Sequence, residues 1–253
     1  MTITACAALV ERGDADRFAA VTAAPLALRG RLFVLYAFNL EVARAPWVTK
    51  EPLIAEMRLQ WWRDVVGEAS PRAHEVAGPL FELIRDAGLP VDVLDRLIAA
   101  RRRDVYSEPF ADAFEFETYL DDTAAGLMWL AAKACGADAA AQPSARAYGW
   151  AHGLANYLRA VPDLTARGRM PLLDKRADAI AALAQAGLAR IAAARADRRL
   201  VGRGGAALLA GWQAERLLRQ VAADPSVVTE GRMGQSEFSR RGGLLWQAVS
   251  GRW

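Results

Sequence analysis

Residues 26 to 46 read LALRGRLFVLYAFNLEVARAP. The apolar residues recur at the three- and four-residue intervals that align side chains on one face of an α-helix. They are Leu26, Leu28, Leu32, Leu35, Tyr36 and Leu40. Proline disfavours a helical conformation in the residue before it. We therefore expect a helix that ends near Ala45, just before Pro46.

Helical spacing continues along most of the chain, and runs that alternate apolar with polar residues are absent. Pro52 opens a second helix, whose predicted apolar face is Ile54, Met57, Trp61, Trp62 and Val65. Further helices are expected at about 75–87, 91–106, 114–135, 143–160, 174–201, 205–222 and 235–250. The separators are short and contain proline or glycine. The sequence thus predicts an all-α fold with a single domain over residues 1–253.

Composition and charge exclude some classes of function. The 253 residues are 53% hydrophobic, which is enough for a full core, and the net charge is only +3. A general nucleic-acid binder neutralises many phosphates and is not expected at this charge. The charge is uneven, with −6 over residues 1–125 and +9 over residues 126–253. The second half is therefore a candidate for contact with an anionic partner or membrane, although a solvated basic face has the same composition.

The cysteines and the N-terminal residues indicate a reducing, cytoplasmic setting. Cys6 and Cys135 lack CxxC spacing, so neither a disulfide framework nor a zinc site is predicted. The first residues lack a basic start and a long apolar run, so we expect no secretory signal. No uncharged stretch approaches the ~20 apolar residues of a spanning helix. We expect a soluble or membrane-peripheral protein.

Common catalytic motifs are missing. His74 and His152 are the two histidines, and neither lies in an HExxH pattern. The sequence contains no P-loop, GxGxxG or GxSxG motif. A helical protein of this kind can still enclose an apolar pocket between facing helices.

Four stretches resemble the squalene and phytoene synthases, which join two prenyl diphosphates head to head. They are RGRLFVLYAFN with MRLQWWRDVV, RRRDVYSEPFADAFEFETYLDDTAAGLMWLAAKACG (101–136), and GLANYLRAVPDLTARGRMPLL (153–173). The resemblance covers about residues 14–175 and implies an isoprenoid-synthase-like helical bundle. In that family two DxxxD motifs on facing helices hold Mg²⁺ around the departing diphosphate. Residues four apart share a helix face, so each motif presents two carboxylates together.

Neither acidic motif is present in this chain. Aligned on the family pattern, the first pair falls on Ala43 and Trp47. The second pair falls on Ala160 and Leu164, after a retained Asn156 and Arg159 that also match the family. Because methyl, indole and isobutyl groups offer Mg²⁺ no oxygen, we predict no catalytic residues, no metal and no cofactor.

An alternative keeps the reaction with relocated acids. In this alternative Asp104, Glu108 and Asp112, which are spaced four apart, combine with Asp163 to hold Mg²⁺. The protein would then be an active Mg²⁺-dependent prenyl transferase. Such acid pairs also arise by chance on solvated helix faces.

A closer resemblance is to a non-catalytic branch of this superfamily. AFNLEVARA, MRLQWWRDVV, LRAVPDLTARGRMPLL and LLWQAVSGRW resemble the branch represented by the mitochondrial complex I assembly factor of phytoene-synthase type. The resemblance implies a membrane-peripheral role in assembling NADH:quinone oxidoreductase, with a complex I subunit or assembly intermediate as partner.

If the fold matches, seven residues line the former substrate cavity and face either a lipid or prenyl chain or a collapsed core. These are Phe33, Tyr36, Asn39, Met128, Asn156, Tyr157 and Arg159. A third possibility is therefore a lipid carrier.

Two segments are candidates for partner or membrane contact. Adjacent residues on a helix point about 100° apart, so one of Trp61 and Trp62 packs inward, and we assign Trp62 to contact. The C-terminal stretch FSRRGGLLWQAVSGRW combines arginines, aliphatics and tryptophans as interfacial helices do. Its candidate contact residues are Arg240, Arg241, Trp246 and Trp253. A terminal helix that packs on its own domain has a similar composition.

Overall fold

The computed structural model describes residues 3–253, and within them every regular element is helical, which confirms the all-α fold. The main helices are α1 (Ile3–Gly13), α2 (Ala15–Ala23), α3 (Leu26–Arg44), α4 (Pro52–Gly67), α5 (Ala77–Ala87), α6 (Val91–Ala100), α7 (Ala113–Leu120), α8 (Gly126–Ala134), α9 (Gln142–Ala166), α10 (Ala177–Ala196), α13 (Ala214–Ala223) and α15 (Glu237–Ser250). Single turns are α11 (Arg198–Val201), α12 (Gly205–Leu208) and α14 (Ser226–Thr229). Shorter elements are 3₁₀ turns, except the π-helical turn η3 (Asp121–Ala125).

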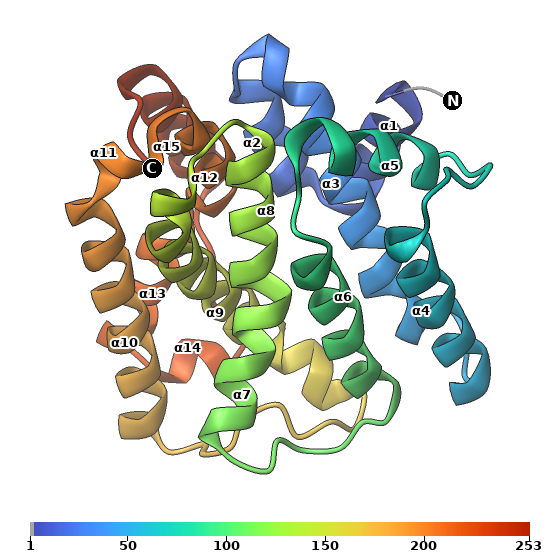
Figure 1. Ribbon diagram of the computed structural model, residues 1–253. Helices are drawn as coiled ribbons and strands as arrows, with labels where there is room; N and C mark the ends of the chain where they lie inside the picture. The colour runs from blue at the N-terminus through green and yellow to red at the C-terminus, as the bar shows by residue number, and fades with distance from the viewer. Residues whose placement is uncertain (1–2) are drawn as a thin grey trace.

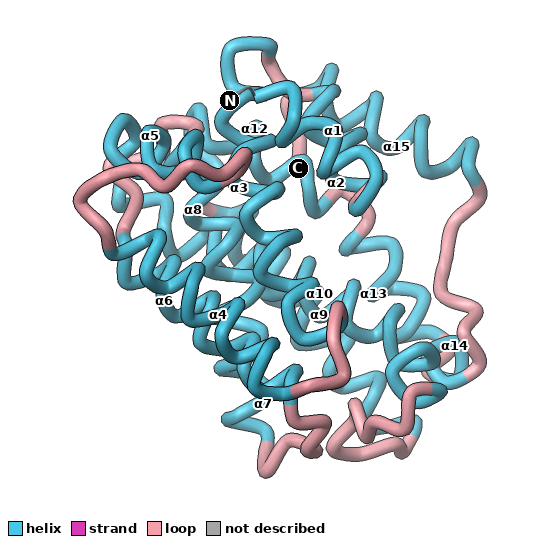
Figure 2. Tube along the Cα trace, turned by 90° about the vertical axis from the view of Figure 1, so that its right-hand side faces the viewer, coloured by secondary structure: helices cyan, strands magenta, loops and turns pink. Residues whose placement is uncertain are grey.

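The long helices form an up-and-down arrangement (Figure 1). The chain turns from α2 into α3 at the top of this view, and α4, α6, α8, α9 and α10 then pass between the two ends. After α14 the chain returns along an extended loop, and α15 lies across the upper end, as Figure 2 shows. One end of the bundle therefore carries the α2–α3 turn together with α15.

Two helices form the centre of the core. Every residue from Leu32 to Leu40 in α3 is buried, as is every residue of α8 up to Ala132. A helix that is apolar on all sides is stable only when it is surrounded. α3 contacts α1, α2, α5 and α8, and α8 also packs on α9 and α6.

Most predicted helices are present, with three corrections. α9 does not stop near residue 160 but continues through Pro162 to Ala166, so Asp163 lies inside a helix. The predicted helix 205–222 is broken at Leu209–Gly211, where the Tyr148 hydroxyl donates a 3.1 Å hydrogen bond to the Gly211 carbonyl. A Cβ on Gly211 would lie 2.5 Å from the Tyr148 ring, so this close approach needs glycine. The third correction is that α1 and α2 were not predicted.

The buried face of α4 differs from the predicted one. Ala55, Leu59, Trp62, Val65 and Val66 are buried, whereas Ile54 and Met57 are exposed. The assignment of Trp62 to partner contact is therefore wrong. Its ring packs edge-on against Phe38 of α3 at 5.4 Å between centroids. Trp61 is the partly exposed neighbour.

α10 is long and apolar enough to cross a membrane by length and composition alone. Here it packs as an outer helix of the bundle against α9 and α13, with Ile180, Ala184 and Ile191 buried. The Arg190 guanidinium pairs with Glu117 at 2.8 Å and also stacks on the Trp150 ring. These contacts are those of a helix that packs on the bundle with one face and is exposed on the other.

Candidate functional site

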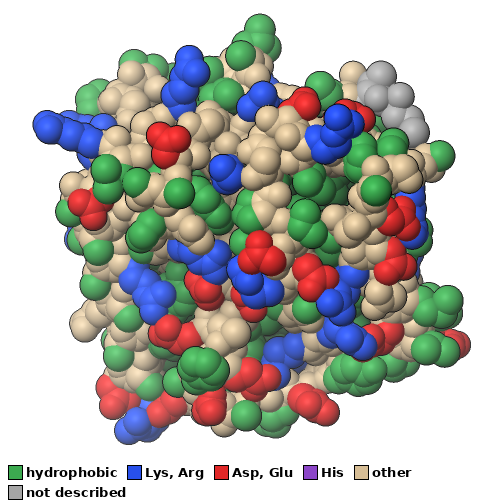
Figure 3. All heavy atoms as spheres, viewed as in Figure 1, with side chains coloured by type: hydrophobic (Ala, Val, Ile, Leu, Met, Phe, Trp, Pro, Cys, Tyr) green, Lys and Arg blue, Asp and Glu red, His purple; other side chains and the backbone are tan. Residues whose placement is uncertain are grey.

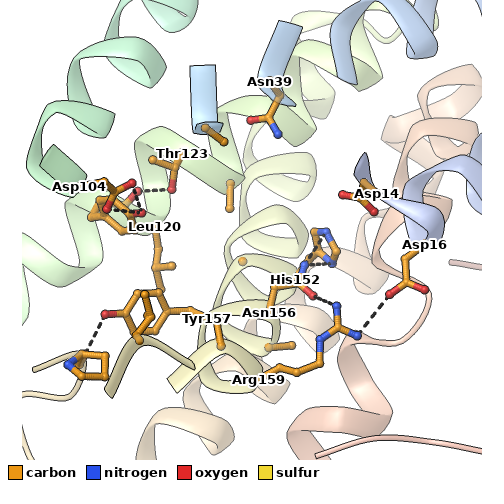
Figure 4. Close-up of a pocket in the computed structure, with 18 of the residues that line it drawn as sticks. Asp14, Asp16, Asn39, Asp104, Leu120, Thr123, His152, Asn156, Tyr157 and Arg159 are labelled. Atoms are coloured by element: carbon orange, nitrogen blue, oxygen red, sulfur yellow. Dashed lines mark hydrogen bonds and ion pairs between the residues drawn. The ribbon is translucent and has the colours of Figure 1, made fainter. Parts of the chain in front are cut away.

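A cavity of about 710 Å³ lies inside the bundle, with walls from α2, α3, α7, η3, α9 and α13 (Figure 4). All four positions that align with the family aspartates line it, namely Ala43, Trp47, Ala160 and Leu164. We call this cavity the chamber. Its charged lining residues are Asp14, Asp16, Asp104, Glu108, Arg17, Arg101, Arg103, Arg159, Arg169 and Arg240. Arginines thus outnumber carboxylates on its walls.

A chain of polar side chains lies on the α9 wall, just before the two positions that align with the second acidic motif. Asn156 Nδ2 lies 3.1 Å from His152 Nε2, and Arg159 donates to the Asn156 amide oxygen at 3.0 Å. Arg159 also reaches Asp16 of α2 at 3.2 Å, and Asp16 accepts from Arg240 of α15 at 2.8 Å. Figure 4 shows this line from His152 to Asp16. The carboxylate here neutralises guanidinium groups of the protein itself.

A second cluster lies on the opposite wall. The Tyr119 hydroxyl donates to Asp104 at 3.0 Å and accepts from Arg101 at 2.7 Å. Arg101 also pairs with Asp104 at 3.2 Å. Burial raises the pKa of the Tyr119 hydroxyl, so this phenol stays protonated at neutral pH. Asp104 is therefore held by protein donors.

Trp47 lies beneath two arginine side chains. Arg169 stacks over its ring at 4.3 Å and Arg167 at 5.2 Å. Arg169 also donates to the backbone carbonyl of Asp104. The Tyr157 hydroxyl binds the Pro171 carbonyl at 2.8 Å on the same segment. Cation–π contacts thus hold residues 167–171 against the chamber at a family metal position.

The donor set of the chamber does not fit Mg²⁺. Of the relocated acids, Asp104 and Glu108 line the chamber, but Asp112 caps α7 by accepting from Glu115 N at 2.8 Å. Asp163 is exposed and is not among the lining residues. Within residues 3–253, no three His, Cys, Asp or Glu side chains are grouped so as to hold a metal ion. Magnesium requires several oxygen ligands, which this arrangement of side chains does not supply.

His152 is buried in the chamber wall. Burial lowers its pKa to about 3, and the nearby Arg17 and Arg159 charges act in the same direction, while Asp16 opposes them. The imidazole is therefore neutral at physiological pH. It is a hydrogen-bonding wall residue that carries no charge.

The predicted cavity residues divide into two groups. Asn39, Asn156, Tyr157 and Arg159 line the chamber. Phe33, Tyr36 and Met128 do not line it, since all three are buried in the core instead. Tyr36, for example, packs beneath Arg17, whose guanidinium lies 5.3 Å from its ring centroid. Asp14, Asp16 and the wall arginines other than Arg159 were not predicted to line the chamber.

Of the predicted C-terminal contact residues, some are exposed and others are covered. Trp246 and Arg241 are exposed on α15. Arg240 is partly covered through its pair with Asp16. The assignment of Trp253 to contact is wrong, because its ring is buried edge-on against Tyr148 at 5.1 Å between centroids.

Several curated relatives resemble about two thirds of this chain. The complex I assembly factor 6 homolog of Drosophila melanogaster is 33% identical over 178 residues, covering 66% of this chain and 53% of that protein. Assembly factor 6 of Bos taurus is 28% identical over 169 residues, covering 65% and 51%, and that of Homo sapiens is 27% identical over 161 residues, covering 62% and 48%. The chain spans about half the length of these relatives.

Solved structures share the fold. A dehydrosqualene synthase superposes with a TM-score of 0.73 at 14% identity, covering 98% of this chain and 95% of that one. A squalene synthase from Alicyclobacillus acidocaldarius superposes with a TM-score of 0.69 at 19% identity, covering 92% and 95%. The squalene/phytoene synthase family model matches residues 10–237. The chain therefore belongs to the squalene/phytoene synthase family.

Proposed function

We propose that this protein is a non-catalytic squalene/phytoene synthase-like assembly factor for respiratory complex I, acting at the inner face of the cytoplasmic membrane. One observation carries the proposal: all four family aspartate positions line an open chamber, yet they hold Ala43, Trp47, Ala160 and Leu164. The relatives named as complex I assembly factors support the assembly role.

The loss of catalysis follows from charge. Ionisation of a prenyl diphosphate places negative charge on the leaving group, and metal ions normally neutralise it. Three of the four chamber carboxylates, Asp14, Asp16 and Asp104, are paired with arginine. No compensating metal cluster is supplied by the part of the chain that the structure describes.

A surface at the start of α4 suits a protein partner. Leu53, Ile54 and Met57 are exposed there, and Val48 is exposed just before them. Figure 3 shows hydrophobic side chains at the lower right, where α4 begins in Figure 1. Neighbouring exposed apolar side chains of this kind are typical of binding surfaces.

Deletion of the gene tests the assembly role. We expect assembled complex I, measured by native gel and NADH oxidation in membranes, to fall severalfold and to return with the wild-type gene. The double variant Ile54→Glu with Met57→Glu should fail to restore it. Phe114→Glu changes a still more exposed apolar residue on α7 and should restore complex I. Unchanged complex I after deletion would rule the role out.

A product assay separates this proposal from the prenyl transferase alternative. Purified protein given farnesyl or geranylgeranyl diphosphate with Mg²⁺ is expected to form no head-to-head product above the protein-free control. A catalytically active squalene synthase in a parallel reaction shows that the assay works. Product formation that EDTA abolishes would instead establish the enzyme.

A lipid carrier is a second candidate, favoured by the persistence of the chamber. Its 710 Å³ is within the range of small-ligand sites. The amide oxygen of Asn39, which lines it, is buried and has no hydrogen-bond partner within residues 3–253. Native mass spectrometry of the purified protein is expected to reveal a co-purified isoprenoid or lipid if the chamber is a carrier site, and only the bare mass if it is not.

A further inference from the structure

A groove of about 960 Å³ lies at the end of the bundle that carries the α2–α3 turn and α15. It is separate from the chamber, with which it shares none of its lining residues. Its walls come from residues 23–31, the start of the α8–α9 loop, residues 198–209 and the last residues of α15 with the segment that follows. We call it the arginine groove.

The charged side chains that line this groove all have one sign. They are Arg29, Arg31, Arg198, Arg203 and Arg252, with no aspartate or glutamate side chain among the lining residues. The chamber differs, because its arginines are interleaved with acids. Figure 3 shows that acidic and basic side chains are also mixed over the lower part of the visible surface.

Within residues 3–253, no carboxylate side chain neutralises the groove arginines. None of the five forms an ion pair with an acidic side chain of the described chain. Three donate to backbone carbonyls: Arg29 to Ala24 at 2.9 Å, Arg31 to Ala134 at 2.9 Å and Arg198 to Gly251 at 3.4 Å. Arg203 and Arg252 are exposed, and no side-chain hydrogen bond of theirs is found in residues 3–253. This concentration of free positive charge is complementary to a phosphate.

Exposed apolar residues accompany the positive charge. Leu26, which itself lines the groove, is 79% exposed and begins α3 at the turn that tops Figure 1. In Figure 3 the same uppermost point is hydrophobic. On α15, Leu245, Trp246 and Val249 are also exposed, while Leu244 faces the core. α15 therefore has one buried edge and one apolar edge that faces solvent.

We propose that this end of the molecule docks on a lipid bilayer and that the arginine groove holds the anionic phosphate of a phospholipid headgroup. The inference rests on the membrane-peripheral part of the proposed function and names the surface and the ligand. Apolar residues enter the boundary between headgroups and acyl chains, and guanidinium groups bind the phosphates beside them. Leu26 and Trp246 supply the apolar contact, and Arg203 and Arg252 bind the phosphates.

Vesicle flotation tests the proposal with the full chain. Wild-type protein is expected to float with phosphatidylcholine vesicles that contain phosphatidylglycerol and far less with pure phosphatidylcholine. Arg203→Gln with Arg252→Gln should weaken binding to the anionic vesicles roughly tenfold, since each cation near an anionic surface contributes severalfold. The matched control is Arg12→Gln with Arg58→Gln, which removes the same charge at exposed positions outside the groove. This control should bind like the wild type.

Several outcomes would overturn the groove assignment. These are equal loss in the two double variants, equal binding to neutral and anionic vesicles, or binding that does not fall as salt rises. Saturable binding of inorganic phosphate without vesicle binding would assign the groove to a free anion. The salt series needs only wild-type protein, so it decides the matter even if a variant misfolds. If the vesicle experiment fails but gene deletion still lowers complex I, only the groove assignment is overturned. If the vesicle experiment succeeds but gene deletion leaves complex I unchanged, only the assembly role is overturned.

Discussion

Replacing Gly153 with valine is expected to lower the free energy of unfolding by about 3 kcal/mol, because there is no space for a side chain between α9 and the π-helical turn η3. A Cβ at this position would lie 2.3 Å from the Cβ of Ala124. Gly149, one turn earlier, is equally tight, with Met128 Cβ at 2.5 Å and the Ala125 backbone at 2.9 Å. The midpoint of thermal unfolding of the Gly153→Val variant should fall by about 9 °C for a domain of this size.

Gly242 provides the matched control. It lies in the middle of α15, and nothing lies within 4 Å of a Cβ built there. Gly242→Ala should therefore stabilise the protein by up to about 1 kcal/mol through helix propensity alone. If Gly153→Val and Gly242→Ala shift the midpoint by similar amounts, the close packing of α9 on η3 is refuted.

This contact also positions the chamber. Thr123 and Ala124 of η3 line it from one side, and His152 and Asn156 of α9 line it from the other. Pairs of residues at α-helical spacing on α9, from His152 to Leu164, share the chamber face. Because Gly149 and Gly153 lie on α9, a side chain at either position would move the wall that holds Asn156 and Arg159.

Much of the fold could be predicted from local patterns, and the failures have tertiary causes. The apolar periodicity of residues 26–44 was sufficient to predict α3, because this helix is surrounded by other helices. The predicted helix 143–160 stops short of Pro162, but α9 continues through this proline to Ala166. A Cβ built on Gly231, just after α14, would lie 3.5 Å from the proline ring. α2 was missed although Asp14 caps it by accepting from Arg17 N at 2.9 Å. That capping signal is present in the sequence.

The chamber was predicted only in part, because its walls combine distant segments. Family alignment placed Ala43, Trp47, Ala160 and Leu164 correctly on its lining. It did not bring Asp16 of α2 to Arg240 of α15, which are 224 residues apart. Nor does spacing along the chain show that Arg169 stacks on Trp47. Ion pairs between remote helices depend on the packing of the whole bundle.

The stability of the protein is expected to depend on the protonation of His152. Its pKa in the folded protein is about 3, against 6.5 for an unperturbed histidine. Because the folded pKa is depressed, the unfolded chain takes up a proton between these values and the folded protein does not. The stability is therefore fully present above pH 6.5 and is lost as the pH falls toward 3, at about 1.4 kcal/mol per pH unit.

Urea unfolding at pH 7 and pH 4.5 measures this contribution. The wild type is expected to lose about 3 kcal/mol over this interval from His152. His152→Gln keeps a polar group beside Asn156 but has no titrating ring, so its loss should be smaller by that amount. Carboxylates whose pKa is lowered by arginine, such as Glu215 beside Arg195 and Arg219, weaken the fold in the same direction but titrate in both proteins. The difference between the losses of the wild type and of His152→Gln therefore comes from His152. Equal losses would mean that the imidazole is hydrated and takes up its proton without unfolding the chamber wall.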